Sequence, residues 1–152
     1  MPDLTEQQAD ELAAAAEIAA VLPSQRAVVP VLCRMAAVDP VTGRAANTSL
    51  LLGLLRGDQA DLRAAFEVTA RMLVGSARPD GQVVSVGSAA RDPKMTAAHN
   101  IVQLSMRGEP EQAWAQVEQQ HPARQAAVLS ILTSFLNYRF AGLDPLTLAA
   151  EE

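Results

Sequence analysis

The stretch from residue 123 to residue 140 reads ARQAAVLSILTSFLNYRF and is the part of the chain that decides the fold. At about 100° per residue, Val128, Leu132, Phe135 and Leu136 fall on one side of a helix. The opposite side carries small or uncharged residues. A helix with a large apolar face and a small, uncharged back is expected to pack against neighbours on both sides. We therefore predict that residues 123–140 form the central helix, or hub, of the domain.

The composition favours helices around this hub. The chain has 152 residues, of which 49% are hydrophobic and 19% charged, so it can bury a core of its own. Aromatic residues make up only 3%, so that core must be aliphatic and rich in alanine. Small side chains let helix backbones approach closely and are poor strand formers. The prediction is a single, compact all-α domain over residues 1–152, with six to eight helices.

An N-terminal acidic helix is predicted over residues 5–22. Its start offers a capping box, formed either by Thr5 and Gln8 or by Asp3 and Glu6. In such a box each of the two side chains satisfies a backbone N–H that the first helical turn leaves unpaired.

The charges of this helix gather on one side. Glu6, Asp10 and Glu17 lie within about 40° of one another, whereas Leu12 and Leu22 fall on the opposite side. The helix is therefore expected to lie at the surface. Its acidic face is either simply solvated or a docking surface for a partner.

The segments before the hub show two further signals. Pro30 lies within a predicted helix over residues 25–38, which it must either kink or open as a first-turn proline. Leucines surround nearly the whole circumference of a predicted helix over residues 48–56, which we therefore expect in the interior.

Residues 82–91 are ambiguous. Val83, Val84 and Val86 are typical of a strand, but no partner strand is evident and a lone strand is not stable. A helix capped by Asp80 is the prediction, with a strand as the alternative.

The chain contains an apparent internal duplication. Residues 55–58 read LRGD and residues 106–109 read MRGE, an offset of about 51 positions. This register predicts two helical units, over residues 24–74 and 77–127. Helix capping alone also places an arginine, a glycine and an acidic residue in this order, so the duplication stays a hypothesis.

The same register bears on the single tryptophan. Trp114 corresponds to Arg63, an outward position, which predicts a partly exposed indole able to anchor a partner. Alternatively, the small Ala113 lets the helix roll and bury the indole.

Motifs for catalysis, metals and cofactors are incomplete. Glu118 and His121 have the spacing of a di-iron helix motif, but the second copy that such a site needs does not occur around His99. Ser85, Asp92 and His99 follow the chain order of a hydrolase triad, but Ser85 lacks the Gly-x-Ser-x-Gly pattern of the strained turn that holds such a nucleophile. Neither a phosphate loop nor a dinucleotide fingerprint is present. We expect no cofactor, no metal and no catalytic residues.

Other features bear on location. Cys33 is the only cysteine, so no intrachain disulfide can form, and it is expected to behave as a small buried hydrophobe. The longest uncharged helical stretch, residues 125–138, is too short and too polar to cross a bilayer. No secretory signal is evident, and a cytoplasmic location is expected.

The first functional hypothesis is a non-catalytic protein–protein interaction or adaptor module that binds a protein partner or itself as a homo-oligomer. Its contact residues would be Trp114 and the acidic Glu6, Asp10 and Glu17. The net charge of −5 and the lack of a basic stripe disfavour nucleic acid as the partner.

Two alternatives stay open. The first is a helix-turn-helix regulator built from residues 50–74, in which Arg63 and Arg71 would contact phosphates. The second is a small-molecule-binding protein or enzyme with a pocket near His99 and Asn100, the least explained polar pair of the sequence.

Overall fold

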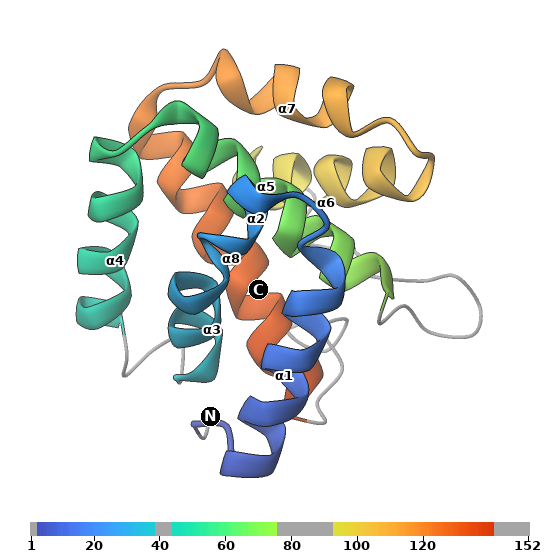
Figure 1. The fold of residues 1–152 in the computed structure, drawn as a ribbon. Coiled ribbons are helices and arrows are strands. Elements are labelled where there is room, and N and C mark those ends of the chain that lie inside the picture. The colour runs from blue at the N-terminus through green and yellow to red at the C-terminus, as the bar shows by residue number, and fades with distance from the viewer. Residues whose placement is uncertain (1–2, 39–43, 76–92, 142–152) are drawn as a thin grey trace.

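The predicted all-α fold is confirmed: α-helices pack around two central helices, α5 (Gln59–Gly75) and α8 (Pro122–Phe140) (Figure 1). The computed structural model describes residues 3–38, 44–75 and 93–141, and these residues contain helices and no strand. The helices are α1 (Glu6–Ala19), α2 (Pro23–Arg26), α3 (Val29–Ala37), α4 (Arg44–Arg56), α5 (Gln59–Gly75), α6 (Pro93–Met106), α7 (Pro110–Glu118) and α8 (Pro122–Phe140).

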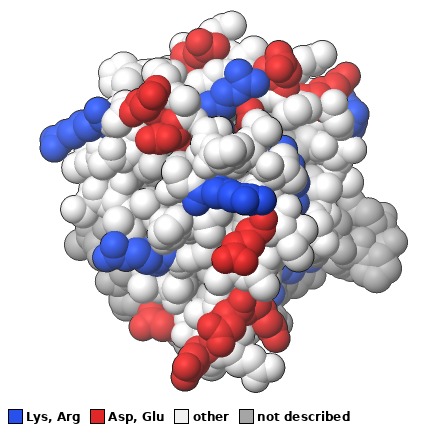
Figure 2. Space-filling model, viewed as in Figure 1, with Lys and Arg blue, Asp and Glu red and all other residues white. Residues whose placement is uncertain are grey.

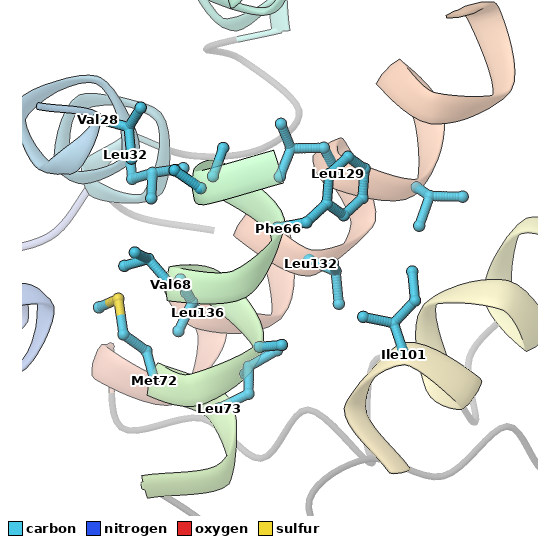
Figure 3. Close-up of a cluster of buried hydrophobic side chains, with 14 of the residues drawn as sticks. Val28, Leu32, Phe66, Val68, Met72, Leu73, Ile101, Leu129, Leu132 and Leu136 are labelled. Carbon is cyan, nitrogen blue, oxygen red and sulfur yellow. The ribbon is translucent and has the colours of Figure 1, made fainter. Parts of the chain in front are cut away.

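α8 lies at the centre, which confirms the predicted hub. It contacts α1, α3, α4, α5 and α6, and in Figure 1 it passes behind the other helices through the middle of the domain. Leu129, Leu132 and Leu136 are fully buried. In Figure 3, Leu132 lies between α5 and Ile101 of α6, whereas Leu136 lies on the side of Val68.

α5 is the second central helix. It contacts each of the other helices, because it lies directly beside α8 and spans 17 residues. Phe66, Val68 and Leu73 project from it into the core around α8 (Figure 3). α5 and α8 together therefore form the centre of the described core.

α1 begins as predicted and ends earlier than predicted. Thr5 is the N-cap, and it forms the capping box with Gln8. The helix ends at Ala19, because the backbone of Ala20 leaves the helical region with φ −87° and ψ 84°. The predicted end at Leu22, and the predicted burial of Leu22, are therefore wrong. Beyond Ala19 the side chain no longer follows the helical period, and Leu22 is 53% exposed.

Pro30 opens a helix and does not kink one. α2 is a single turn, and α3 starts with Val29 and Pro30 in its first turn, where a proline costs no hydrogen bond. The predicted helix over residues 25–38 is thus divided into two.

The expectation that the leucine-rich helix lies in the interior is wrong. α4 packs at one side of the domain (Figure 1). Leu51 and Leu54 are buried against its neighbours, but Leu52 is 42% exposed. The helix buries one face only, because the domain supplies partners for α4 on one side.

Two predictions about the middle of the chain are not tested. The segment 82–91 lies outside the described residues. The proposed units 24–74 and 77–127 each contain a helix pair, but α5 has 17 residues and α7 only nine. The duplication remains a prediction.

Asn137 joins α8 to the end of α3. Its side chain is buried, and Nδ2 donates hydrogen bonds to the carbonyl oxygens of Ala36 (2.8 Å) and Val38 (3.1 Å). These carbonyls end a helix and have no partner within it. One amide thus satisfies two backbone acceptors at the domain centre.

We predict that Asn137→Ala lowers the free energy of unfolding by about 2 kcal/mol, because it removes two buried hydrogen bonds and leaves both acceptors unpaired. Urea denaturation measures the change. Ser134→Ala is the matched control on the same helix. Among the described residues Ser134 bonds only the Ser130 carbonyl one turn earlier, so the loss of its hydroxyl should cost less than about 0.5 kcal/mol. Equal effects of the two substitutions would contradict this role of Asn137.

Candidate functional site

The end of α1 carries an exposed apolar surface. Ile18 is 80% exposed, Val21 60% and Leu22 53%, all within five residues of one another. Single exposed hydrophobic residues are common on proteins, whereas a contiguous group is typical of an interaction site. We call these three residues and the two grooves beside Ile18 the α1 apolar surface.

Ile18 forms a ridge between the two grooves. One groove runs towards α2 and α3 and is lined by Ala14, Glu17, Arg26, Val29 and Pro30. The other runs towards α5 and α8 and is lined by Ala15, Ala19, Arg71, Met72, Gly75 and Phe140. A partner that covers Ile18 could therefore place side chains on both sides of it.

A polar network holds this end of α1 in place. Gln25 is 2% exposed, and its Oε1 accepts hydrogen bonds from the backbone N–H groups of Val21 (3.1 Å) and Leu22 (3.2 Å). Its Nε2 donates to Glu67 of α5 at 2.8 Å. Gln25 thereby connects the turn after α1 to α5.

Two arginines complete the network from α5. Arg63 Nε donates to Glu67 Oε1 at 2.6 Å, and this bond is the first cause of the raised pKa of Arg63. Arg71 Nη1 donates to the Ala19 carbonyl at the end of α1 and to Gln25 Oε1. A buried polar network of this kind is stable only when its members are paired. The α1 apolar surface therefore rests on a rigid support.

The acidic residues lie where the sequence predicted them. Glu6, Asp10 and Glu17 are exposed. Figure 2 shows acidic side chains gathered at the lower end of the molecule, over the start of α1. The exposed side of α1 is thus acidic towards its N-terminus and apolar towards its C-terminus.

Trp114 lies elsewhere, and the expectation that it is partly exposed is wrong. The indole is 8% exposed and packs against Phe66, with ring centroids 6.3 Å apart and ring planes tilted by 52°. Ala113 beside it is also buried. The alternative prediction, in which the small Ala113 lets the helix roll and bury the indole, agrees with this arrangement.

Trp114 borders a cavity between α5, α6 and α7, which we call the α5–α7 cavity. Its volume is about 180 Å³. Its apolar walls are Phe66, Val74, Ile101, Pro110, Ala113, Trp114 and Val117, and its other lining residues are Glu67, Arg71, Ser105 and Gly108.

His99 and Asn100 belong neither to this cavity nor to the α1 apolar surface. Two positions along α6 turn the helix by about 200°, so His99 points away from Ile101, which lines the cavity. Asn100 is exposed. The structure places the predicted polar pair away from the cavity to which its helix contributes.

His99 is half-buried and its Nδ1 is a buried atom with no hydrogen-bond partner among the described residues. Burial lowers the pKa of His99 from its ordinary value of 6.5, because desolvation disfavours the imidazolium.

Other predicted positions have local roles. His121 is the N-cap of α8 and accepts a hydrogen bond from the backbone N–H of Ala123. Cys33 is partly buried, and burial raises the pKa of its thiol. Arg63 and Arg71, the predicted phosphate contacts of a helix-turn-helix, are bonded within the domain. Within the described ranges no cluster of three or more metal-ligating side chains occurs.

Sequence reasoning missed Ile18, although a signal for it exists. Ile18 follows Glu11 by seven positions, which places the two side chains about 20° apart on a helix. An isoleucine on the same face as a glutamate is a signal that Ile18 can be exposed, and the structure shows both residues exposed. The α5–α7 cavity has no such signal, since its walls come from three helices.

No protein-family model, curated protein or solved structure matches this chain. In the part of the chain that the structure describes, no helix is both long enough and apolar enough to cross a membrane.

The pKa of His99 leads to a prediction of pH-dependent stability. The folded protein holds the neutral imidazole, so the unfolded chain takes up the proton at higher pH than the folded chain does. Stability should therefore be highest above the unfolded pKa of 6.5 and fall as the pH decreases below it.

Urea denaturation between about pH 5 and pH 8 tests this window. His99→Gln cannot take up the proton, so its stability should depend less on pH below 6.5 than that of the unmodified protein. Asn100→Gln, at an exposed neighbouring position, should keep the original pH dependence. Parallel curves for the unmodified protein and His99→Gln would show that another group causes the loss.

Proposed function

We propose that this chain is a non-catalytic binding module, and that its α1 apolar surface docks a basic, amphipathic segment of a partner protein. The observation that carries the proposal is the 80% exposure of Ile18 on a ridge between two grooves, beside Val21 and Leu22. Among the described residues, Ile18 is the most exposed large hydrophobic side chain, followed by Val21 and Leu22.

The hydrophobic effect favours covering this surface. Burial of one isoleucine, valine or leucine side chain contributes about 1.5–3 kcal/mol. Three such side chains supply enough to hold a docked segment after part of that energy offsets the entropy lost on association. Ile18 would be the anchor, because it is the most exposed of the three.

The charges beside the anchor favour a basic partner. Glu17 and Arg26 line one groove, and Asp10 and Glu6 continue the acidic side of α1 away from it, so carboxylates outnumber the cation along this side. Anionic lipid and nucleic acid would be repelled by these carboxylates. A partner helix with apolar anchors followed by lysine or arginine matches both halves of the surface.

Rigidity of the surface also supports the proposal. Gln25 and Arg71 hold the end of α1 against α5, so little conformational freedom of the backbone is lost when a partner binds.

The first test is calorimetric titration of the full chain with a helical peptide of leucine and lysine, and with a peptide in which glutamate replaces lysine. We expect the lysine peptide to bind and the glutamate peptide to bind weakly, because of the charge on α1. Ile18→Gln should weaken binding at least about tenfold, which corresponds to about 1.4 kcal/mol. Leu52→Gln, the matched control at an exposed leucine on α4, should leave the affinity unchanged.

The natural partner is then sought by affinity purification with the same three proteins. A partner retained by the unmodified chain and by Leu52→Gln, but lost by Ile18→Gln, would support the proposal if its binding segment is basic. Analytical ultracentrifugation tests whether a second copy of the chain covers the surface in place of a partner protein. A dimer of the unmodified chain that Ile18→Gln converts into a monomer would mean that a second copy covers the surface, and the proposed partner class would be wrong.

A further inference from the structure

We propose that the α5–α7 cavity is a binding site for a small carboxylate with a single aromatic ring, held by Arg71 at one end and by Phe66 and Trp114 at the other. The inference does not rest on the proposed partner surface, although Arg71 lines both the cavity and one of the grooves beside Ile18.

The inner end of the cavity suits an aromatic ring. Phe66, Ile101 and Val117 are almost fully buried, and Trp114 and Ala113 close the wall from α7. The Phe66 and Trp114 rings are tilted by 52° to one another, so a third ring can contact the edge of one and the face of the other. An apolar cavity of roughly 150 Å³ accommodates benzene, and this one has about 180 Å³. The space therefore fits one ring with a short substituent.

Arg71 adds a cation to the lining of the cavity. The hydrogen bonds of Arg71 to described residues involve Nη1 alone. Nε and Nη2 form the edge of a guanidinium that binds a carboxylate through two parallel hydrogen bonds. Because Nη1 is bound to the Ala19 carbonyl, the guanidinium is held in position before a ligand arrives.

Glu67, the acidic residue of the lining, does not cancel this charge. Its Oε1 accepts from Arg63 and its Oε2 from Gln25, so its charge is paired with Arg63 and its hydrogen bonds among the described residues go to groups other than Arg71. A ligand carboxylate beside Arg71 would thus meet a cation whose contacts within the described residues are to neutral groups. Ser105, which also lines the cavity, adds a hydroxyl donor.

A ligand can reach the site from solvent. Gly108 and Pro110 on the rim are exposed, and Val74 and Ser105 are half-buried. The walls thus pass from buried apolar residues to a partly open, polar rim, as in ordinary small-molecule sites.

Trp114 provides the readout, because it is the only tryptophan of the chain and lies in the cavity wall. Phenylacetate is the probe, and benzyl alcohol is its neutral counterpart with the same ring. We expect phenylacetate to cause a saturable change in Trp114 fluorescence, with a Kd of roughly millimolar or tighter for a ligand of this size. Benzyl alcohol should bind at least about tenfold more weakly, because it cannot form the paired bonds to Arg71.

Two variants test the two ends of the site. Arg71→Gln should reduce the preference for phenylacetate over benzyl alcohol, whereas Arg34→Gln, at an exposed site on α3, should preserve it. Ala113→Leu places a larger side chain in the cavity and should abolish binding of both probes without lowering the melting temperature. Because Ala113 takes no part in the Arg71 network, this variant separates loss of the site from loss of the α1–α5 contact.

The proposal is overturned if neither probe produces a saturable change in the unmodified protein, or if Ala113→Leu binds phenylacetate as well as the unmodified protein does. Equal affinity for the two probes, unaffected by Arg71→Gln, would overturn the assignment of a carboxylate ligand. None of these results depends on whether Ile18 binds a partner, so the two proposals fail or succeed separately.

Discussion

Burial of α8 on both flanks is the constraint on which the rest of this domain depends. The helices around it are short, and α2, α3 and α7 would not be stable as isolated peptides of four to nine residues. α3 and α7 persist because they place apolar side chains against α8 or against α5 beside it, and α2 is held to α5 by the hydrogen bond from Gln25 to Glu67. Leu129, Leu132 and Leu136 show almost no exposure, so loss of any one would leave a cavity that several helices share.

Packing alone leaves backbone N–H and C=O groups at the ends of helices without hydrogen-bond partners. Two buried side-chain amides bond such groups at the places where the chain turns. Asn137 donates hydrogen bonds to the carbonyls at the end of α3, and Gln25 accepts hydrogen bonds from the N–H groups after α1. Asn137 lies on α8 and bonds the end of α3, whereas Gln25 lies on α2 and joins the turn after α1 to α5. Because these amides are buried, their hydrogen bonds cannot be replaced by water at low cost. They fix where α1 and α3 end and hence which side chains face solvent.

The two candidate sites have opposite character and share one wall. The α1 apolar surface is exposed and bordered by carboxylates, whereas the α5–α7 cavity is a partly open recess with aromatic walls and a guanidinium in its lining. Arg71 lines both the cavity and the groove beside Ile18. Its bond to the Ala19 carbonyl keeps α1 in contact with α5 and at the same time orients the guanidinium in the cavity. A single side chain therefore supports both surfaces.

The features that the sequence determined by itself are those that depend on local periodicity and capping. They include the all-α class, the capping box of Thr5 and Gln8, the central helix α8 and the exposed acidic side of α1. Tertiary structure alone decided the exposure of Leu22 and Leu52, the burial of Trp114 and the existence of the α5–α7 cavity. The period of a helix specifies which residues share a face, but whether that face is covered depends on segments far away in the chain. Phe66 buries Trp114 from a position 48 residues earlier, and no spacing within either helix encodes that contact.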